Sequence, residues 1–217
     1  MIRLLLAALF GGLTALSSPA EGIAATAQAA LSPDDSAAVG RAVRYLNGIS
    51  TLRARFVQIS SNGTYAEGEV LVERPGKMRF EYDPPHPVLI IANGLTLLFY
   101  DRELKQASFL PLWETPLWFL IREKVTLSGA VRVVRVQRDR GALRVTLRDA
   151  KIADAGTVTL VFSDRPLALR KWEVVDTQGI RTEVALLNPR FGVPIDPQAF
   201  DYKDLEINTA PTHPSGR

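Results

Sequence analysis

Two short segments of alternating character, joined by Pro-Gly, constrain this chain more than any other feature. Charged and apolar side chains alternate along residues 77–82, and residues 67–72 alternate in a similar way. A period of two predicts β-strands with one apolar and one charged face. The Pro-Gly dipeptide at 75–76 predicts a turn between them. The stretch therefore predicts a hairpin with one apolar face.

The length of this turn decides which side chains share a face. A two-residue turn would mix apolar with charged partners, because a slip of one residue exchanges the two faces. A three-residue loop pairs Val72 with Phe80. It also pairs Val70 with Tyr82 and keeps one face apolar, so we expect this longer loop. Arg74 is in phase with Val70 and Val72, which predicts an arginine at the end of the apolar face.

The rest of the chain predicts more strands of the same kind. Turn signals at 62–63, 93–94 and 140–141 separate runs of alternating residues, a pattern typical of hairpins. Short consecutive strands with tight turns predict a mainly β (α+β) fold, an antiparallel meander with one buried and one solvated face. We expect eleven strands, near 52–60, 65–74, 77–83, 87–92, 95–101, 104–110, 131–138, 142–149, 157–163, 168–176 and 180–188.

An amphipathic helix is expected before the first strand. Ser32 suits the N-cap and Pro33 the first helical position, and Asn-Gly at 47–48 suits the end. The apolar residues recur at helical spacing, so one face of this helix has to cover something apolar. They are Val39, Ala42, Val43 and Leu46.

The most apolar stretch after the N-terminal residues is 111–121. Thr115 suits a helix N-cap with Pro116 after it, and residues 117–121 are apolar on all sides. A short helix of this kind would be buried or would plug a cavity. Residues 196–200 predict one more helical turn.

The N-terminus has the pattern of a secretory signal peptide. A positive charge precedes an apolar run over 4–16, and small residues follow it, so we expect cleavage that removes residues 1–29. The apolar run is short for a membrane span, and an uncleaved anchor is the alternative. We expect an exported, monomeric protein with one domain over 30–207 and a disordered tail over 208–217.

Composition and motifs argue against an enzyme, a metalloprotein and a nucleic-acid-binding protein. The 217 residues include no cysteine, which excludes disulfides, thiolate metal sites and a lipid-modified cysteine. A net charge of +3 is not typical of a nucleic-acid-binding protein. His86 and His213 lack partners at metal-binding spacing, and no nucleophile elbow or phosphate-binding loop occurs. Glu67, Glu69 and Glu73 are interpreted as a solvated strand face. We therefore expect no catalytic residues, metal or cofactor.

The apolar face of the predicted sheet is the remaining candidate site. Its side chains form either an ordinary packed core or the lining of a cavity, and the pattern does not separate the two. They are Phe56, Val70, Val72, Met78, Phe80, Tyr82, Leu89, Ile91, Leu97 and Phe99.

Several segments together resemble one known family. They are 54–58 (ARFVQ), 74–85 (RPGKMRFEYDPP), 89–94 (LIIANG), 98–101 (LFYD), 104–107 (LKQA) and 115–121 (TPLWFLI). Their order and spacing over about residues 39–204 resemble the periplasmic outer-membrane lipoprotein carriers of the LolA family. The resemblance implies an incomplete antiparallel barrel with a lid of short helices, which enclose an apolar cavity for the acyl chains of lipoproteins.

The same resemblance implies partners and a location. Family members work in the periplasm, take lipoproteins from an inner-membrane ATP-driven releasing complex and, in many bacteria, pass them to an outer-membrane receptor lipoprotein. Two alternatives remain open on the residues: a carrier or sensor of another amphiphilic lipid, and a periplasmic hydrolase. The hydrolase needs a polar cleft where an apolar one is expected.

The resemblance also assigns roles within the lid. It implies that Arg74 hydrogen-bonds to the backbone of a lid helix and holds the empty cavity closed, a role that suits the five donors of a guanidinium. An arginine that extends from the rim into water is the alternative. Residues expected in the lid are Val39, Val43, Leu46, Trp113, Leu117, Trp118 and Phe119. For the three aromatic residues among them, an ordinary place in the core is the alternative.

Overall fold

The computed structural model describes residues 31–115, 118–150 and 156–207, so the features expected at 1–29 and 208–217 lie outside it. The described residues form one α-helix, eleven strands and three short 3-10 helices. In chain order these are α1 (Pro33–Asn47), β1 (Thr51–Ser60), β2 (Tyr65–Glu73), β3 (Lys77–Tyr82), β4 (Val88–Asn93), β5 (Thr96–Asp101), β6 (Gln106–Pro111), η1 (Leu112–Glu114), η2 (Trp118–Leu120), β7 (Val131–Asp139), β8 (Ala142–Asp149), β9 (Thr157–Asp164), β10 (Leu167–Val175), β11 (Arg181–Phe191) and η3 (Pro197–Phe200).

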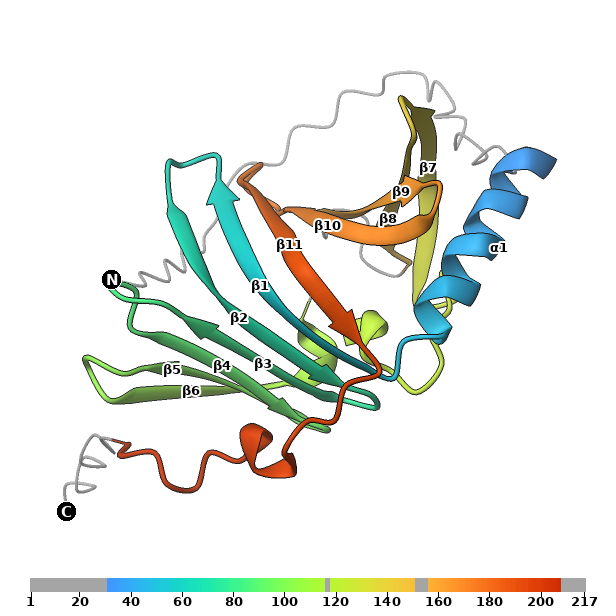
Figure 1. Cartoon of the computed structure of the whole chain (residues 1–217). Coiled ribbons are helices and arrows are strands. Elements are labelled where there is room, and N and C mark those ends of the chain that lie inside the picture. The colour runs from blue at the N-terminus through green and yellow to red at the C-terminus, as the bar shows by residue number, and fades with distance from the viewer. Residues whose placement is uncertain (1–30, 116–117, 151–155, 208–217) are drawn as a thin grey trace, which may run out of the picture. The chain divides into compact units, whose positions relative to one another are not determined.

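The strands form one antiparallel sheet in the order β6-β5-β4-β3-β2-β1-β11-β10-β9-β8-β7. Neighbours along the chain pair as hairpins from β1 to β6 and from β7 to β11, and β1 pairs with β11 at the centre. Figure 1 shows β1–β6 as one part of the sheet and β7–β10 as a second part set at a steep angle to it. Within the described residues β6 and β7 each pair on one side only, so the sheet stays open. The prediction of a mainly β fold with an open antiparallel sheet of about eleven strands is confirmed.

The hairpin formed by β2 and β3 has the three-residue loop that the sequence predicts, over 74–76. The expected partners were wrong by two residues, because Val70 pairs with Phe80 and Val72 pairs with Met78. A shift of two residues leaves every side chain on its own face, since the side-chain period of a strand is also two. The apolar face is therefore preserved.

Helix α1 begins and ends where expected. The Oγ of Ser32 accepts a hydrogen bond of 3.1 Å from the backbone N–H of Asp35, and Pro33 is the first helical residue. Ala38, Ala42 and Leu46 are buried along one face of the helix, and they pack into the main core cluster on the concave face of the sheet.

A second apolar cluster lies on the opposite, outer face of β2–β5. Leu71, Leu89, Ile91, Leu98 and Tyr100 are buried there. The C-terminal segment, defined here as residues 193–207, packs over them through side chains that include Phe200, which is 3% exposed. The predicted helical turn near 196–200 is confirmed as η3. In Figure 1 this segment runs below β3–β6.

The segment over 111–121 contains two short 3-10 helices, η1 and η2. The second, Trp118–Leu120, lies where the sequence predicts a short helix. The hydroxyl of Thr115 donates to the carbonyl of Leu112, 2.8 Å away, and this contact closes η1. Pro116 and Leu117 lie outside the described residues. Among the helices that are described, none is long and apolar enough to cross a membrane.

Candidate functional site

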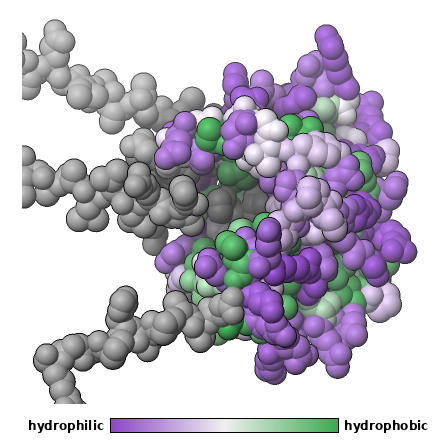
Figure 2. Space-filling model, turned by 90° about the vertical axis from the view of Figure 1, so that its left-hand side faces the viewer, coloured by the Kyte–Doolittle hydropathy of each residue, from purple (hydrophilic) through white to green (hydrophobic). Residues whose placement is uncertain are grey.

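The cross-strand register places most of the predicted apolar residues on the concave face. One row runs through Val70, Phe80, Ile90 and Phe99, and the next runs through Val72, Met78, Ala92 and Leu97. Phe56 and Tyr82 lie on either side of Gly68 in a third row. In Figure 2 hydrophobic side chains gather around a recess on the face shown.

Leu89 and Ile91 do not belong to this face, and their predicted placement was wrong. They are 1% and 0% exposed in the outer cluster, covered by the C-terminal segment. Their neighbour Ile90 takes the concave position, opposite Phe80 and Phe99. Because residues 88–92 are apolar at every position, the sequence carries no alternation there from which the faces can be read.

Aromatic rings form the wall beneath the recess. The ring of Phe56 is completely buried, and its centroid lies 5.2 Å from that of Phe80 and 5.1 Å from that of Tyr82, both edge-to-face. Phe80 contacts the ring of Trp172 from β10 at 6.2 Å. Edge-to-face pairs of this kind add stability beyond the area they bury. The wall therefore joins the two parts of the sheet through a rigid set of rings.

Glycine at position 68 makes this wall possible. A Cβ built on Gly68 would lie 2.6 Å from a ring carbon of Phe56 and 2.1 Å from the carbonyl oxygen of Glu81. The ring of Phe56 therefore occupies the space that any other side chain at 68 would need.

Two apolar hollows lie next to each other at the wall, with several lining residues in common. The inner hollow has a volume of about 70 Å³ and is bounded by α1, β1, β2, β3, β10, η2 and the segment after η2, defined here as residues 121–130. Its lining is apolar apart from Arg74. The outer hollow has about 360 Å³ and shares Met78, Phe80, Ile121 and Trp172 with the inner one. Its few polar side chains are Gln58, Thr115 and Thr182.

Tyr82 supplies a polar group at the edge of the outer hollow. Its hydroxyl donates to the Oε1 of Gln58 at 2.8 Å. Burial raises the pKa of Tyr82, and the hydrogen bond with Gln58 opposes that effect only in part. The tyrosine is therefore neutral at physiological pH, so the hollow carries no charge from this ring.

Arg74 lies between the hairpin loop and α1. Its Nε donates to the carbonyl of Ile49 at 2.6 Å, and its Nη2 donates to the carbonyl of Leu46 at 2.5 Å and also to that of Ile49. Burial lowers the pKa of Arg74. The Nη1 atom is buried and has no hydrogen-bond partner within the described chain. The guanidinium thus binds two carbonyls where α1 ends: that of Leu46, which also accepts from the N–H of Ile49 at 3.2 Å, and that of Ile49, just after the helix.

A second contact joins α1 to the segment after η2, and the sequence interpretation missed it. The side-chain amide of Asn47 donates to the carbonyl of Val125 and accepts from its N–H, both at 2.9 Å. It also donates to the carbonyl of Val43 at 3.0 Å. Asn47 had been interpreted only as a helix-stop residue, because its partner is 78 positions away and no local pattern indicates it.

The remaining predicted lid residues divide into three groups. Leu46 and Phe119 are buried in the main core cluster, and Val39, Val43 and Trp118 pack against it. Trp113 does not cover the hollows, because it is 60% exposed. Leu117 lies outside the described residues. The guanidinium of Arg122 stacks on Trp118 at 4.9 Å from the ring centroid.

The described residues contain no group of three or more His, Asp or Glu side chains that fits a metal ion.

The fold and the site define a class of protein: an open antiparallel sheet that holds an apolar hollow under a helix. The chain belongs to the outer membrane lipoprotein carrier family LolA, whose family profile matches residues 47–203.

Curated relatives agree with this assignment. An outer-membrane lipoprotein carrier protein of Pseudomonas paraeruginosa is 28% identical over 178 residues, which cover 78% of this chain and 85% of the relative. The protein of the same name from Azotobacter vinelandii is 26% identical over 185 residues, which cover 80% of this chain and 88% of the relative. An uncharacterized conserved protein from Thermus thermophilus shares the fold, with a TM-score of 0.50 and 12% identity. The match covers 79% of this chain and 97% of that protein.

Proposed function

We propose that this protein carries lipoproteins through the periplasm, from the inner to the outer membrane, with their acyl chains in the apolar hollow of the sheet. The observation that carries the proposal is the hollow itself. Its walls are apolar side chains from both parts of the sheet, and its cover is attached through Arg74. The family to which the chain belongs and the names of its relatives support the same cargo.

The physical need for a carrier follows from the hydrophobic effect. Each buried methylene stabilises the shielded state by about 0.8 kcal/mol, so a lipid anchor with several chains does not cross water unaided. Transfer from one apolar site to another changes little apolar exposure and needs no covalent chemistry. A non-enzymatic carrier without cofactor is therefore sufficient.

The inner hollow is too small for acyl chains by itself. Its volume is about 70 Å³, whereas ligand pockets typically hold about 300 Å³ or more, and the outer hollow of about 360 Å³ lies at the lower end of that range. Acyl chains therefore enter the inner hollow only if α1 and the segment after η2 move away from the sheet. Arg74 binds α1 to the hairpin loop, so it opposes that movement.

In this mechanism Arg74 acts as the latch of the lid. Opening breaks its bonds to Leu46 and Ile49, and closing restores them. The closed state therefore favours release of the cargo. The inner-membrane ATP-driven releasing complex supplies the energy for loading, and an outer-membrane receptor lipoprotein, where present, accepts the cargo.

The Arg74→Leu variant tests the proposal. It removes the bonds to α1 but keeps an apolar side chain in their place, so we expect it to accept lipoprotein and to release it poorly. The measurement is transfer of a radiolabelled lipoprotein from inner-membrane vesicles to the carrier and then to outer-membrane vesicles. Normal delivery by Arg74→Leu would refute the latch.

Mass spectrometry of material bound to that variant tests the cargo. Lipoprotein in the bound fraction supports the proposal, whereas a free lipid or glycolipid in its place would refute lipoprotein carriage.

A further inference from the structure

The outer face of β7 and β8 carries four arginines that form a compact group, here called the arginine ladder: Arg132, Arg135, Arg144 and Arg148. Arg132 pairs directly with Arg148 across the two strands. Arg135 pairs with Thr146, and Arg144 with Gln137. Their neighbours on the opposite face, such as Val133 with Leu147, belong to the core.

Acidic partners are missing from the ladder in the part of the chain that the structure describes. There, none of its four guanidiniums makes an ion pair within 4.0 Å, and the Nε of Arg148 is buried without a hydrogen bond. The neighbouring outward side chains on β9 are Thr157, Thr159, Val161 and Ser163. Like charges directly opposite each other on a sheet are destabilising, so stability of the fold does not account for this arrangement.

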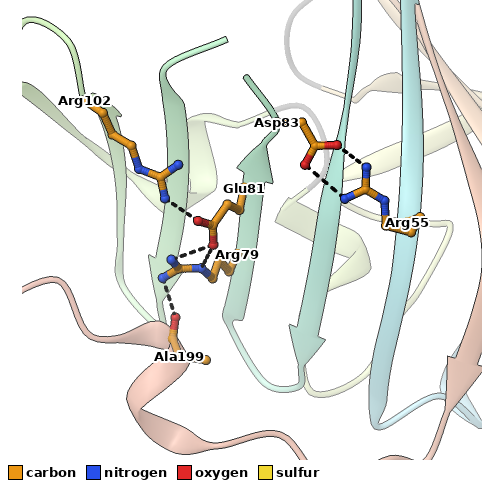
Figure 3. Close-up of polar contacts among 6 residues, drawn as sticks. All are labelled: Arg55, Arg79, Glu81, Asp83, Arg102 and Ala199. Carbon is orange, nitrogen blue, oxygen red and sulfur yellow. Dashed lines mark hydrogen bonds and ion pairs between the residues drawn. The ribbon is translucent and has the colours of Figure 1, made fainter. Parts of the chain in front are cut away.

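The outer face of β1–β5 shows the opposite arrangement. There Arg55 pairs with Asp83, and Glu81 accepts from both Arg79 and Arg102 (Figure 3). Arg53 and Lys77 have acidic partners as well, Glu69 at 2.6 Å and Glu73 at 2.9 Å. Among the described residues, the positive charge of the outer surface is thus neutralised on β1–β5 and not at the arginine ladder.

The kind of partner follows from what the ladder lacks. Stable protein interfaces have an apolar centre from which charge is depleted. Among the described residues no large hydrophobic side chain is exposed on β7, β8 or β9. Guanidiniums on neighbouring strands of a sheet present donors on one surface, and donors of this type bind phosphate oxygens in pairs.

We propose that the arginine ladder of β7 and β8 binds the phosphate groups of an anionic phospholipid bilayer. The contact is electrostatic and lies on the side of the sheet away from the hollow. A carrier bound in this way stays near a membrane surface and leaves it readily, because no apolar side chain inserts. The proposal does not depend on the identity of the cargo.

Vesicle binding tests the ladder. The probe is the mature protein from periplasmic extract, which lacks the segment expected to be removed, mixed with phosphatidylcholine vesicles with or without phosphatidylglycerol. Each basic residue near an anionic surface contributes about 1 kcal/mol, a factor of roughly five in binding. The double variant Arg132→Gln/Arg135→Gln is therefore expected to bind anionic vesicles about 30-fold more weakly than the unmodified protein.

A matched control variant has the same net charge as the ladder variant. Arg165→Gln/Arg190→Gln removes two arginines that lie outside the ladder, and its binding should stay within a few-fold of the unmodified protein. Binding should weaken as salt shortens the screening length from about 30 Å to about 8 Å. Equal binding by the two double variants, or equal binding to neutral and anionic vesicles, would overturn the proposal.

A soluble acidic polymer separates a membrane from a protein partner. Poly-glutamate should compete weakly with anionic vesicles, because its carboxylates are not held on a surface. If poly-glutamate binds the ladder more tightly than the vesicles do, the partner is an acidic protein segment and the bilayer proposal is wrong.

Discussion

Replacement of Asn47 by alanine tests whether α1 and the segment after η2 move as one cover. The amide of Asn47 makes three hydrogen bonds, two to Val125 and one to Val43. The variant Asn47→Ala removes them and leaves the N–H and carbonyl of Val125 without these partners. The side chain of Val125 is completely buried, so the segment beside it is held tightly against the core.

The expected loss is worked from these bonds. A hydrogen bond contributes about 0.5–1.5 kcal/mol net, and a buried group left unpaired costs about 1–3 kcal/mol. Water reaches part of this site, because Asn47 is an exposed residue, so we take about 1–3 kcal/mol for the whole contact. A loss of that size raises the population of the opened segment roughly 5- to 150-fold.

Amide hydrogen exchange measures this opening at the residue concerned. The N–H of Val125 donates to Asn47, so its exchange rate should rise roughly 5- to 150-fold in Asn47→Ala. The control is Ser32→Ala at the other end of α1, which removes the N-cap at a cost of about 1 kcal/mol. That variant should loosen the start of the helix without affecting Val125.

Two outcomes would refute the reasoning. Unchanged exchange at Val125 in Asn47→Ala would mean that other contacts hold the segment. Equal acceleration in Ser32→Ala would mean that Val125 reports general loosening of α1 and not a specific bridge.

Two further predictions concern the sheet. Gly68→Ala should destabilise the protein by about 3 kcal/mol or more, because the alanine Cβ would meet the ring of Phe56 and the backbone of Glu81. Urea unfolding measures the loss of stability. For Glu81, burial raises the pKa, but hydrogen bonds from Arg79 and Arg102 outweigh burial and lower it overall. A lowered pKa gives stability that is present above the unfolded-state value and lost as pH falls through the folded-state value. Glu81→Gln should therefore lower the urea midpoint at neutral pH, and the two midpoints should converge in acid; a constant difference would contradict this.

Local patterns predicted the framework of the protein. Strand positions followed from side-chain alternation and turn residues. In β2 and β3, for example, apolar residues alternate with polar ones along each strand. The start of α1 followed from Ser32 and Pro33, whose effects act within one turn. The resemblance to a family directed attention to Arg74, which lies against the end of α1.

Long-range contacts accounted for the misplaced or missed residues. Asn47 and Val125 meet across 78 positions, and no periodicity records such a pair. The short helix expected within 117–121 is of the 3-10 type, which the pattern did not predict, because apolar residues on all sides fit any buried conformation.

The amino-acid sequence by itself determined that this chain forms an antiparallel sheet with an apolar face, because side-chain alternation is a local property. Only the tertiary structure decided which face each residue of β4 occupies. The C-terminal segment covers the outer side of that strand, so Leu89 and Ile91 are as fully buried there as residues on the concave side. Where both faces of a strand are buried, hydrophobicity no longer distinguishes them, and the packing of distant segments makes the choice.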